Sequence, residues 1–272
     1  MFQLSRQQRR KARRDAIERG RKALGCGLGA EIAEDEALGV ALILHERLID
    51  RSRPGGAAEA AEIAERLLQR SLATDLKGLE VGCRKGCNYC CAARVIISAP
   101  EIFRVANWLR ENATARSAQL QLGDILLEAH RRDGISFQDR IAEKVMCPML
   151  VDDACGVYEV RPISCRAVFS MSAEACKIAL VDDTKEMPLV VPTMRKGDVV
   201  RSVLLAAVSG AGLSDRGIEY VGGIRIALEE RDAEARWLAG EDIFDAVPGA
   251  ERRPDARQLQ DRLIGFLRQL AE

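Results

Sequence analysis

The chain has 272 residues, of which 47% are hydrophobic, so it is long enough to bury a core without disulfides. Its 41 Lys and Arg balance 41 Asp and Glu, which excludes recruitment of polyanions or polycations by net charge alone. Aromatic residues make up only 4%, and this composition, rich in Ala, Leu and Arg, favours helices over sheets.

The N-terminal residues 1–25 form a predicted basic arm, because Lys and Arg greatly outnumber Asp and Glu there. Aromatic side chains are not interleaved with these charges, so a solvated, partly helical leader is expected, and a nucleic-acid contact of this arm stays open as the less favoured alternative. No apolar run is long enough to span a membrane, and charges stand where a signal peptide would have its apolar core. We therefore expect a cytoplasmic protein with no membrane partner.

Residues 26–80 predict a helical hairpin. Apolar residues recur at helical spacing on both sides of a break at residues 53–56, which reads Arg-Pro-Gly-Gly. The positions expected to be buried are Ala37, Ala41, Leu44, Leu48, Ala60, Ala64, Leu67 and Leu68.

Residues 81–180 are expected to form a cysteine-cluster domain. The β-branched residues 93–97 predict a short strand, and Ser98 with Glu101 forms a capping box that predicts a helix. A further helix is expected around residues 122–129. From Cys147 onward the turn residues predict a loop, which metal coordination would order.

Residues 181–272 contain no cysteine and are expected to be a helical region packed on the cysteine domain. Two apolar stripes predict its helices, one over residues 200–208 and one over residues 259–270. The predicted fold class is therefore mainly α with a small irregular or β cysteine-cluster core, a helix-dominated α+β fold.

Nine cysteines in a reducing compartment indicate metal binding or catalysis rather than a disulfide framework. Cys83, Cys87, Cys90 and Cys91 are spaced so that thiolates from one loop converge, and Gly86 allows the backbone to curl around them. Two adjacent side chains tend to point apart, so Cys90 and Cys91 do not both fit one tetrahedral zinc without strain.

A second set follows at Cys147, Cys155, Cys165 and Cys176, and together the two sets exceed the four ligands of one structural zinc or one simple cluster. Two metals, one larger centre, or a cluster with spare redox-active thiols all remain open. An all-sulfur ligand set suits both zinc and iron.

Basic residues near the cysteines in sequence are candidates to offset thiolate charge. They are Arg84, Lys85, Arg94, Arg161 and Arg166. His45 and His130 have ordinary helical explanations and are not expected to be ligands. Cys26 stands apart from the others and is expected to be an ordinary half-buried residue.

The pattern Cys83-x3-Cys87-x2-Cys90-Cys91, followed by Cys147-Pro-Met-Leu and the segment Cys155-Gly-Val-Tyr158-x2-Arg161-Pro-x2-Cys165-Arg, resembles the YkgJ-type cysteine-cluster family of zinc- or iron-chelating domains. That family includes the bacterial flagellin lysine N-methylases. The resemblance covers residues 83–176. It implies a metal-binding set of Cys83, Cys87, Cys90, Cys91, Cys147, Cys155, Cys165 and Cys176. Tyr158 and Pro162 are expected to shape the loop, Tyr158 by packing beside the cluster and Pro162 by fixing a helix start.

The expected function is metal chelation, with an iron-sulfur centre of the [4Fe-4S] type preferred over zinc. The first alternative, implied by the resemblance, is a protein-lysine N-methyltransferase that uses S-adenosylmethionine and acts on a protein substrate. No glycine-rich strand-to-helix turn supports this alternative, and no catalytic residue is assigned.

The triplet Cys83, Cys87 and Cys90 also resembles that of radical S-adenosylmethionine enzymes. Those enzymes resemble a partial β/α barrel, and the sequence lacks the alternating strands and helices of such a fold. The remaining alternative is redox sensing or electron transfer by the cluster and its spare thiols.

Overall fold

The computed structural model describes most of the chain. The described residues are 5–29, 33–51, 53–84, 86–112, 146–182, 184–247, 249–250 and 254–271. Helices dominate this part of the protein and the strands are short, which confirms the predicted fold class. Among the described residues, no helix is both long and apolar enough to cross a bilayer.

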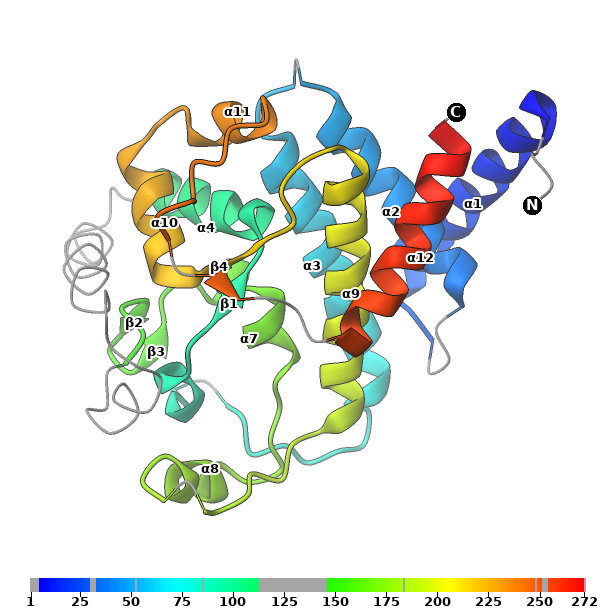
Figure 1. Cartoon of the computed structure of the whole chain (residues 1–272). Helices are drawn as coiled ribbons and strands as arrows, with labels where there is room; N and C mark the ends of the chain where they lie inside the picture. Colours follow the sequence, from blue (N-terminus) through cyan, green and yellow to red (C-terminus); the bar gives the residue numbers. More distant parts are fainter. Residues whose placement is uncertain are drawn as a thin grey trace.

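Long helices from both ends of the chain form one bundle (Figure 1). In chain order they are α1 (Arg6–Cys26), α2 (Glu34–Ile49), α3 (Gly56–Asp75), α9 (Val191–Gly210) and α12 (Pro254–Ala271). Helix α9 contacts α2, α3, α7 and α12 and so lies at the centre of the packing. The predicted hairpin is α2 and α3, and all eight of its expected core positions are buried.

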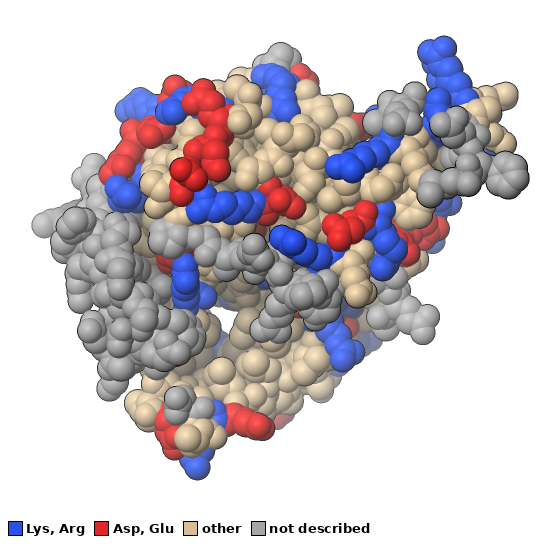
Figure 2. Space-filling view, in the orientation of Figure 1, with Lys and Arg blue, Asp and Glu red and all other residues tan. Residues whose placement is uncertain are grey.

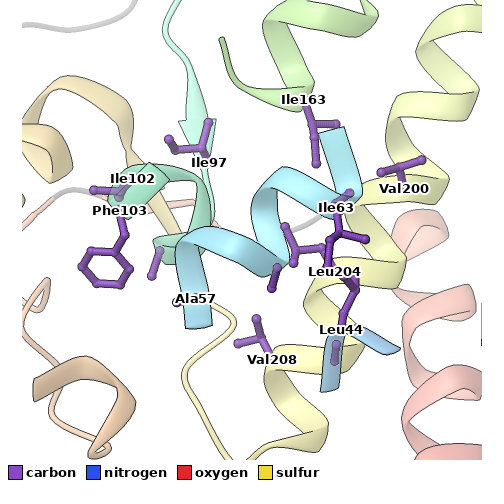
Figure 3. Close-up of a cluster of buried hydrophobic side chains, with 14 of the residues drawn as sticks. Leu44, Ala57, Ile63, Ile97, Ile102, Phe103, Ile163, Val200, Leu204 and Val208 are labelled. Carbon is purple, nitrogen blue, oxygen red and sulfur yellow. The ribbon is translucent and has the colours of Figure 1, made fainter. Parts of the chain in front are cut away.

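The bundle core extends without interruption to the cysteine-rich segment. Figure 3 shows Ile63 of α3 and Val200 of α9 in the same cluster as Ile163, which belongs to α7 (Ile163–Ala167). Ile163 and Val200 are completely buried. Helix α7 carries Cys165, so burial of its apolar face holds this cysteine against the bundle.

A three-stranded antiparallel sheet connects the middle of the chain with its C-terminal third. Its strands are β1 (Ile96–Ile97), β4 (Gly217–Glu219) and β5 (Gly249–Ala250), in the order β1, β4, β5. The predicted strand over residues 93–97 is thus shorter than expected, and Ile96 pairs with Glu219. Helix α10 (Tyr220–Glu229) follows β4 and contacts it, and it packs on α4 (Ala99–Asn112) and on α11 (Ala233–Leu238).

Short elements make up the cysteine-rich segment. They are η1 (Tyr89–Ala92), β2 (Leu150–Val151), β3 (Ala154–Cys155), η2 (Tyr158–Val160) and α8 (Ala173–Ala179). In Figure 1 they lie at the opposite end of the molecule from α1 and α12. On the face drawn in Figure 2, Lys and Arg are interspersed with Asp and Glu, in keeping with the zero net charge.

A single buried carboxylate joins the starts of two helices. One oxygen of Glu101 accepts from the Ser98 N–H at 3.0 Å and the Ser98 hydroxyl at 2.7 Å, at the start of α4. Its other oxygen accepts from the Ile163 N–H at 2.9 Å, at the start of α7. The expected role of Glu101 in capping is confirmed, and because N-terminal N–H groups favour negative charge, this residue stabilises both helices. Pro162 precedes α7 at its cap, as expected.

Helix α9 holds α7 from the other side. The Thr193 hydroxyl donates to the Ala167 carbonyl at 2.8 Å, and Arg201 donates to the Ser164 hydroxyl at 2.8 Å. A Cβ atom at Gly197 would lie 2.5 Å from the Cβ of Ala167, so only glycine permits this approach. The short helix that carries Cys165 is therefore fixed on two sides.

The basic N-terminal region is a continuous helix that packs on α2. A Cβ atom at Gly20 would lie 2.3 Å from the carbonyl carbon of Gly39, and one at Gly39 would lie 2.0 Å from the Ala16 carbonyl oxygen. The two backbones thus cross in direct contact. The region that the sequence predicted as a partly helical leader is helical from Arg6 to Cys26.

One expected helix cannot be compared with the structure, and the expected burial of Cys26 is wrong. The helix expected around residues 122–129 lies outside the described residues, as does His130. Cys26 is exposed rather than half-buried, and its thiol donates to the Lys22 carbonyl at 3.2 Å, because it ends α1 on the solvent side.

Two glycines of α1 provide a matched test of the helix crossing. Gly20→Ala should lower the free energy of unfolding by about 1–3 kcal/mol, because α1 must move away from α2. Gly25→Ala should raise it by roughly 0.5–1 kcal/mol, because a Cβ atom there meets nothing within 4 Å and alanine favours the helix. Urea unfolding followed by circular dichroism measures both. Equal effects of the two substitutions would contradict the crossing.

Glu101→Gln should lower the free energy of unfolding by about 1.5–3 kcal/mol, because an amide nitrogen would face one of the donors that the carboxylate now accepts. Glu111→Gln is the control, since Glu111 is exposed on the same helix and its substitution should change stability by less than about 0.5 kcal/mol. A Glu101→Gln protein as stable as the control would show that this carboxylate does not join the two helices.

Candidate metal centre

The first cysteine block is a loop that tightens into one helical turn. The Cys87 N–H donates to the Arg84 carbonyl at 2.9 Å, and the Cys91 N–H donates to the Asn88 carbonyl at 2.8 Å. Gly86 has φ +84°, which confirms the expectation that glycine is needed to curl this loop.

The second block begins with a hairpin. Leu150 pairs with Cys155 across β2 and β3, so the connection is the two-residue turn Asp152–Asp153. Both aspartates have positive φ, 48° and 60°, as a type I′ turn requires. The Asn88 side chain donates to the Asp153 carboxylate at 3.0 Å and ties the hairpin to the first block. The sequence predicted the turn but not the two strands.

One backbone hydrogen bond joins the two blocks beside their cysteines. The Cys147 N–H donates to the Cys91 carbonyl at 2.9 Å. Residues far apart in the sequence are therefore neighbours here.

We define the inner group as the thiols that interact with one another around this junction, namely Cys90, Cys91, Cys147, Cys155 and Cys165. Burial raises the pKa of the Cys165 thiol, and the charges of Cys147, Cys90 and Cys155 raise it further. Interaction between the Cys90 and Cys91 thiols raises the pKa of Cys91 and lowers that of Cys90. These thiols cannot all ionise together unless a cation joins them.

We define the outer group as Cys83, Cys87 and Cys176. Burial raises the pKa of the Cys83 thiol, and Cys87, Cys90 and Cys176 add to the rise, so these side chains are also neighbours. The Ser170 N–H donates to the Cys83 sulfur at 3.3 Å. Backbone N–H donors of this kind stabilise thiolate charge at metal centres.

Cys90 interacts with members of both groups. Its charge raises the pKa of Cys165 in the inner group and that of Cys83 in the outer group. The eight cysteines expected to bind metal therefore form two neighbouring groups that share a boundary at Cys90.

Arg161 supplies positive charge to the inner group. It opposes the burial-driven rise in the pKa of Cys155 and Cys165. Its guanidinium lies 4.0 Å from the centre of the Tyr158 ring, and its buried Nε has no hydrogen-bond partner. Tyr158 is 55% exposed and covers Arg161 at the surface, and its expected packing beside the cysteines stays a prediction.

The other basic candidates differ in their surroundings. Arg84 and Arg94 are exposed, and Lys85 lies outside the described residues. Arg166 is buried, donates to the Glu159 carbonyl at 2.7 Å and helps to offset the charge near Cys155.

A buried ionic network lies behind the inner group. Glu65 of α3 is 3% exposed and accepts from Arg104 at 2.8 Å, while Arg166 lies 3.7 Å away. Burial raises the pKa of Glu65 to about 7 against the opposing effect of both arginines. No motif in the sequence singled out Glu65, because it sits in an ordinary helical pattern far from the cysteines.

Sulfur is the donor that this region offers to a metal. His45 lies in α2 beside Gly210, where burial lowers its pKa. Within the described ranges, no three His, Cys, Asp or Glu side chains are arranged to hold a single ion. The gathered thiols and the charge of Arg161 nevertheless match the chemistry of zinc or iron held by thiolates.

Tyr220 is a further residue at the inner group that sequence reasoning missed. It begins α10, is 3% exposed, and its hydroxyl has no hydrogen-bond partner. Its pKa is raised well above the usual value by burial and by the charges of Cys147, Cys165 and Cys155. Nothing in the local sequence distinguishes it from a core tyrosine.

Comparison with known families agrees with this geometry. Residues 82–186 match the family model described as "CxxCxxCC: Putative zinc- or iron-chelating domain". Neither a curated protein nor a solved structure matches the chain. The matched segment contains every cysteine of both groups, so it is residues 82–186 that are similar to this cysteine-cluster family of zinc- or iron-chelating domains.

Proposed function

We propose that the cysteines of residues 82–186 hold an iron-sulfur centre. The observation that carries the proposal is the inner group, in which five thiols from η1, the loop before β2, β3 and α7 act on one another's ionisation. The hydrophobic effect gives no reason for several thiols to gather in one place. Binding of a shared cation gives such a reason, because each thiolate then gains a strong attraction.

The number and placement of the sulfurs favour a polynuclear centre over one zinc ion. A tetrahedral zinc accepts four ligands, and the inner group alone has five thiols. Cys91 lies against Cys147, whereas Cys90 interacts with both groups. We assign Cys91, Cys147, Cys155 and Cys165 to a [4Fe-4S] cluster. Cys83, Cys87, Cys90 and Cys176 hold a second metal or serve as redox-active thiols.

Neighbouring charges support thiolate ligands at this place. Four thiolates around a cluster leave net negative charge, and Arg161 and Arg166 lie where they offset it. The Ser170 N–H offers a hydrogen bond to the Cys83 sulfur. Iron bound here would supply electron transfer or Lewis-acid chemistry.

Methyl transfer to a protein lysine is the alternative function that the family resemblance implies. The glycine pair of the C-terminal region gives it no support. A Cβ at Gly223 would lie 2.3 Å from the Ile102 side chain, and one at Gly222 would lie 2.9 Å from that of Val247. Both glycines serve the packing of α10, which accounts for them without a nucleotide-binding role.

Anaerobic isolation of the full chain tests the proposal. We expect a brown protein with sulfur-to-iron charge-transfer absorption and matching amounts of iron and acid-labile sulfide. A colourless protein with stoichiometric zinc would overturn the iron-sulfur assignment and leave a zinc centre. Titration with S-adenosylmethionine belongs to the same preparation, and absence of saturable binding would exclude the methyl-transfer alternative.

Single cysteine substitutions test which thiols hold the metal. Cys165→Ser should lose metal and solubility, because a ligand thiolate is removed from the inner group. Cys87→Ser should also lose metal if the outer group holds a second metal, and should keep it if the outer thiols are redox-active. Cys26→Ser is the matched control, since its thiol is exposed and bonds only to backbone carbonyls. Metal analysis of the three purified variants measures the effect, and the same metal content in all three would refute the assignment.

A further inference from the structure

Some of the basic side chains of α1 are used to attach this helix to its neighbour. Arg13 donates to the Glu46 carboxylate at 2.9 Å, and Arg19 lies 2.9 Å from the Asp35 carboxylate. Both carboxylates belong to α2. These two arginines therefore have a structural role that accounts for them.

A second set of basic residues lies on the side of α1 that faces away from α2. The buried positions of the helix are Ala16, Gly20 and Ala23, which recur at helical spacing and mark its inner side. We define the outer stripe as the exposed basic residues on the opposite side, namely Arg10, Lys11, Arg14, Arg21 and Lys22. Among the described residues, its one ion pair joins Arg14 to Asp15 of the same helix at 3.6 Å. The described elements outside α1 thus leave the charge of the stripe unneutralised.

The concentration of positive charge opposes the folding of α1 itself. No acidic residue stands between Arg6 and Arg14, and none lies in the first turn. Arg10 is four residues from both Arg6 and Arg14, and like charges at this spacing repel each other on a helix. Cations in the first turn also oppose the helix dipole. Helix formation therefore gives no reason for this sequence, whereas a bound polyanion would turn the repulsion into attraction.

The stripe is nevertheless presented in fixed positions. The backbone contact between Gly20 and Gly39 holds α1 on α2. At 1.5 Å per residue, the stripe from Arg10 to Lys22 is about 18 Å long, which corresponds to roughly five base-pair steps of 3.4 Å. Figure 2 shows Lys and Arg side chains projecting at the upper right, where Figure 1 places α1. A preformed row of cations can meet a row of phosphates without ordering of the backbone.

The chemistry of α1 favours a phosphate backbone over a membrane surface. Ala16 and Ala23 are buried, and Ile17 and Leu24 pack against the core. A helix that lies in a bilayer interface inserts such an apolar face, but in α1 the bundle already covers it. The helix contains no aromatic residue on which unpaired bases could stack. These features match a double helix, whose phosphates are exposed and whose bases are already stacked on one another.

We infer that the outer stripe of α1 binds the phosphate backbone of double-stranded nucleic acid without reading its base sequence. This interaction is separate from the metal centre, because the cysteine-rich segment lies at the opposite end of the molecule (Figure 1). Phosphate contacts release counterions, so binding weakens as the salt concentration rises. The chain has no net charge, so the attraction is local to the stripe and decays within a Debye length.

The test replaces three residues of the stripe together in the full chain, as Arg10→Gln, Arg14→Gln and Arg21→Gln. Glutamine has a helix propensity close to that of arginine, so α1 should stay folded, which circular dichroism checks. The control protein replaces three exposed cations of other described segments, as Lys77→Gln, Arg195→Gln and Arg231→Gln. Both proteins lose the same charge, so a difference between them reports where the charges stand.

Fluorescence anisotropy of labelled duplex DNA and labelled duplex RNA measures binding from about 50 to 200 mM KCl. We expect the wild-type and control proteins to bind duplexes of any base sequence equally. For the stripe variant, the slope of log affinity against log salt should be less steep by about one for each lost phosphate contact, or roughly three in all. A preference for one duplex would identify which nucleic acid supplies the phosphates.

Four results would overturn the inference. The first is absence of duplex binding by the wild-type protein at about 50 mM KCl, and the second is an equal loss of binding in the stripe variant and the control. Tighter binding to phosphatidylserine vesicles than to duplexes would assign a membrane surface instead. Tighter binding to poly-glutamate would assign an acidic protein.

Discussion

Mutual repulsion among neighbouring, partly buried thiols is the constraint on which the cysteine-rich region depends. The charges of Cys147, Cys90 and Cys155 oppose ionisation of Cys165, and burial opposes it further. A multivalent cation reverses the sign of this interaction, because each ionised sulfur then gains a strong attraction. Hydrogen bonds hold the elements that carry the cysteines in fixed positions. Glu101 joins α7 to α4, α9 holds α7 from the other side, and the Cys147 N–H joins the two cysteine blocks.

Local patterns in the sequence predicted most of the scaffold. The Ala and Leu spacing of α2 and α3 identified buried positions correctly, since helical periodicity depends only on residues three and four apart. The same holds for Ser98 with Glu101, for Pro162 at the start of α7 and for the left-handed Gly86. In each case one or two neighbouring residues determine the backbone.

Features that depend on distant partners escaped prediction. The Asp152–Asp153 turn contains no glycine, so it did not signal a hairpin, and its strands are fixed by pairing and by Asn88. The second hydrogen-bonding role of Glu101, with Ile163, is visible only once α7 lies against α4. Glu65 and Tyr220 come from helices on either side of the cysteine motif, and no spacing rule relates them to it. Which cysteines bind metal stays a prediction.

The position of Tyr220 bears on how this region could be transplanted. The family match ends at residue 186, whereas an unpaired hydroxyl at residue 220 and a carboxylate at residue 65 lie behind its thiols. An excised fragment of residues 82–186 would retain every thiol of both groups but lose this lining and the α9 clamp on α7. Grafted onto a foreign scaffold, the same cysteines would therefore meet a different dielectric and a different set of donors.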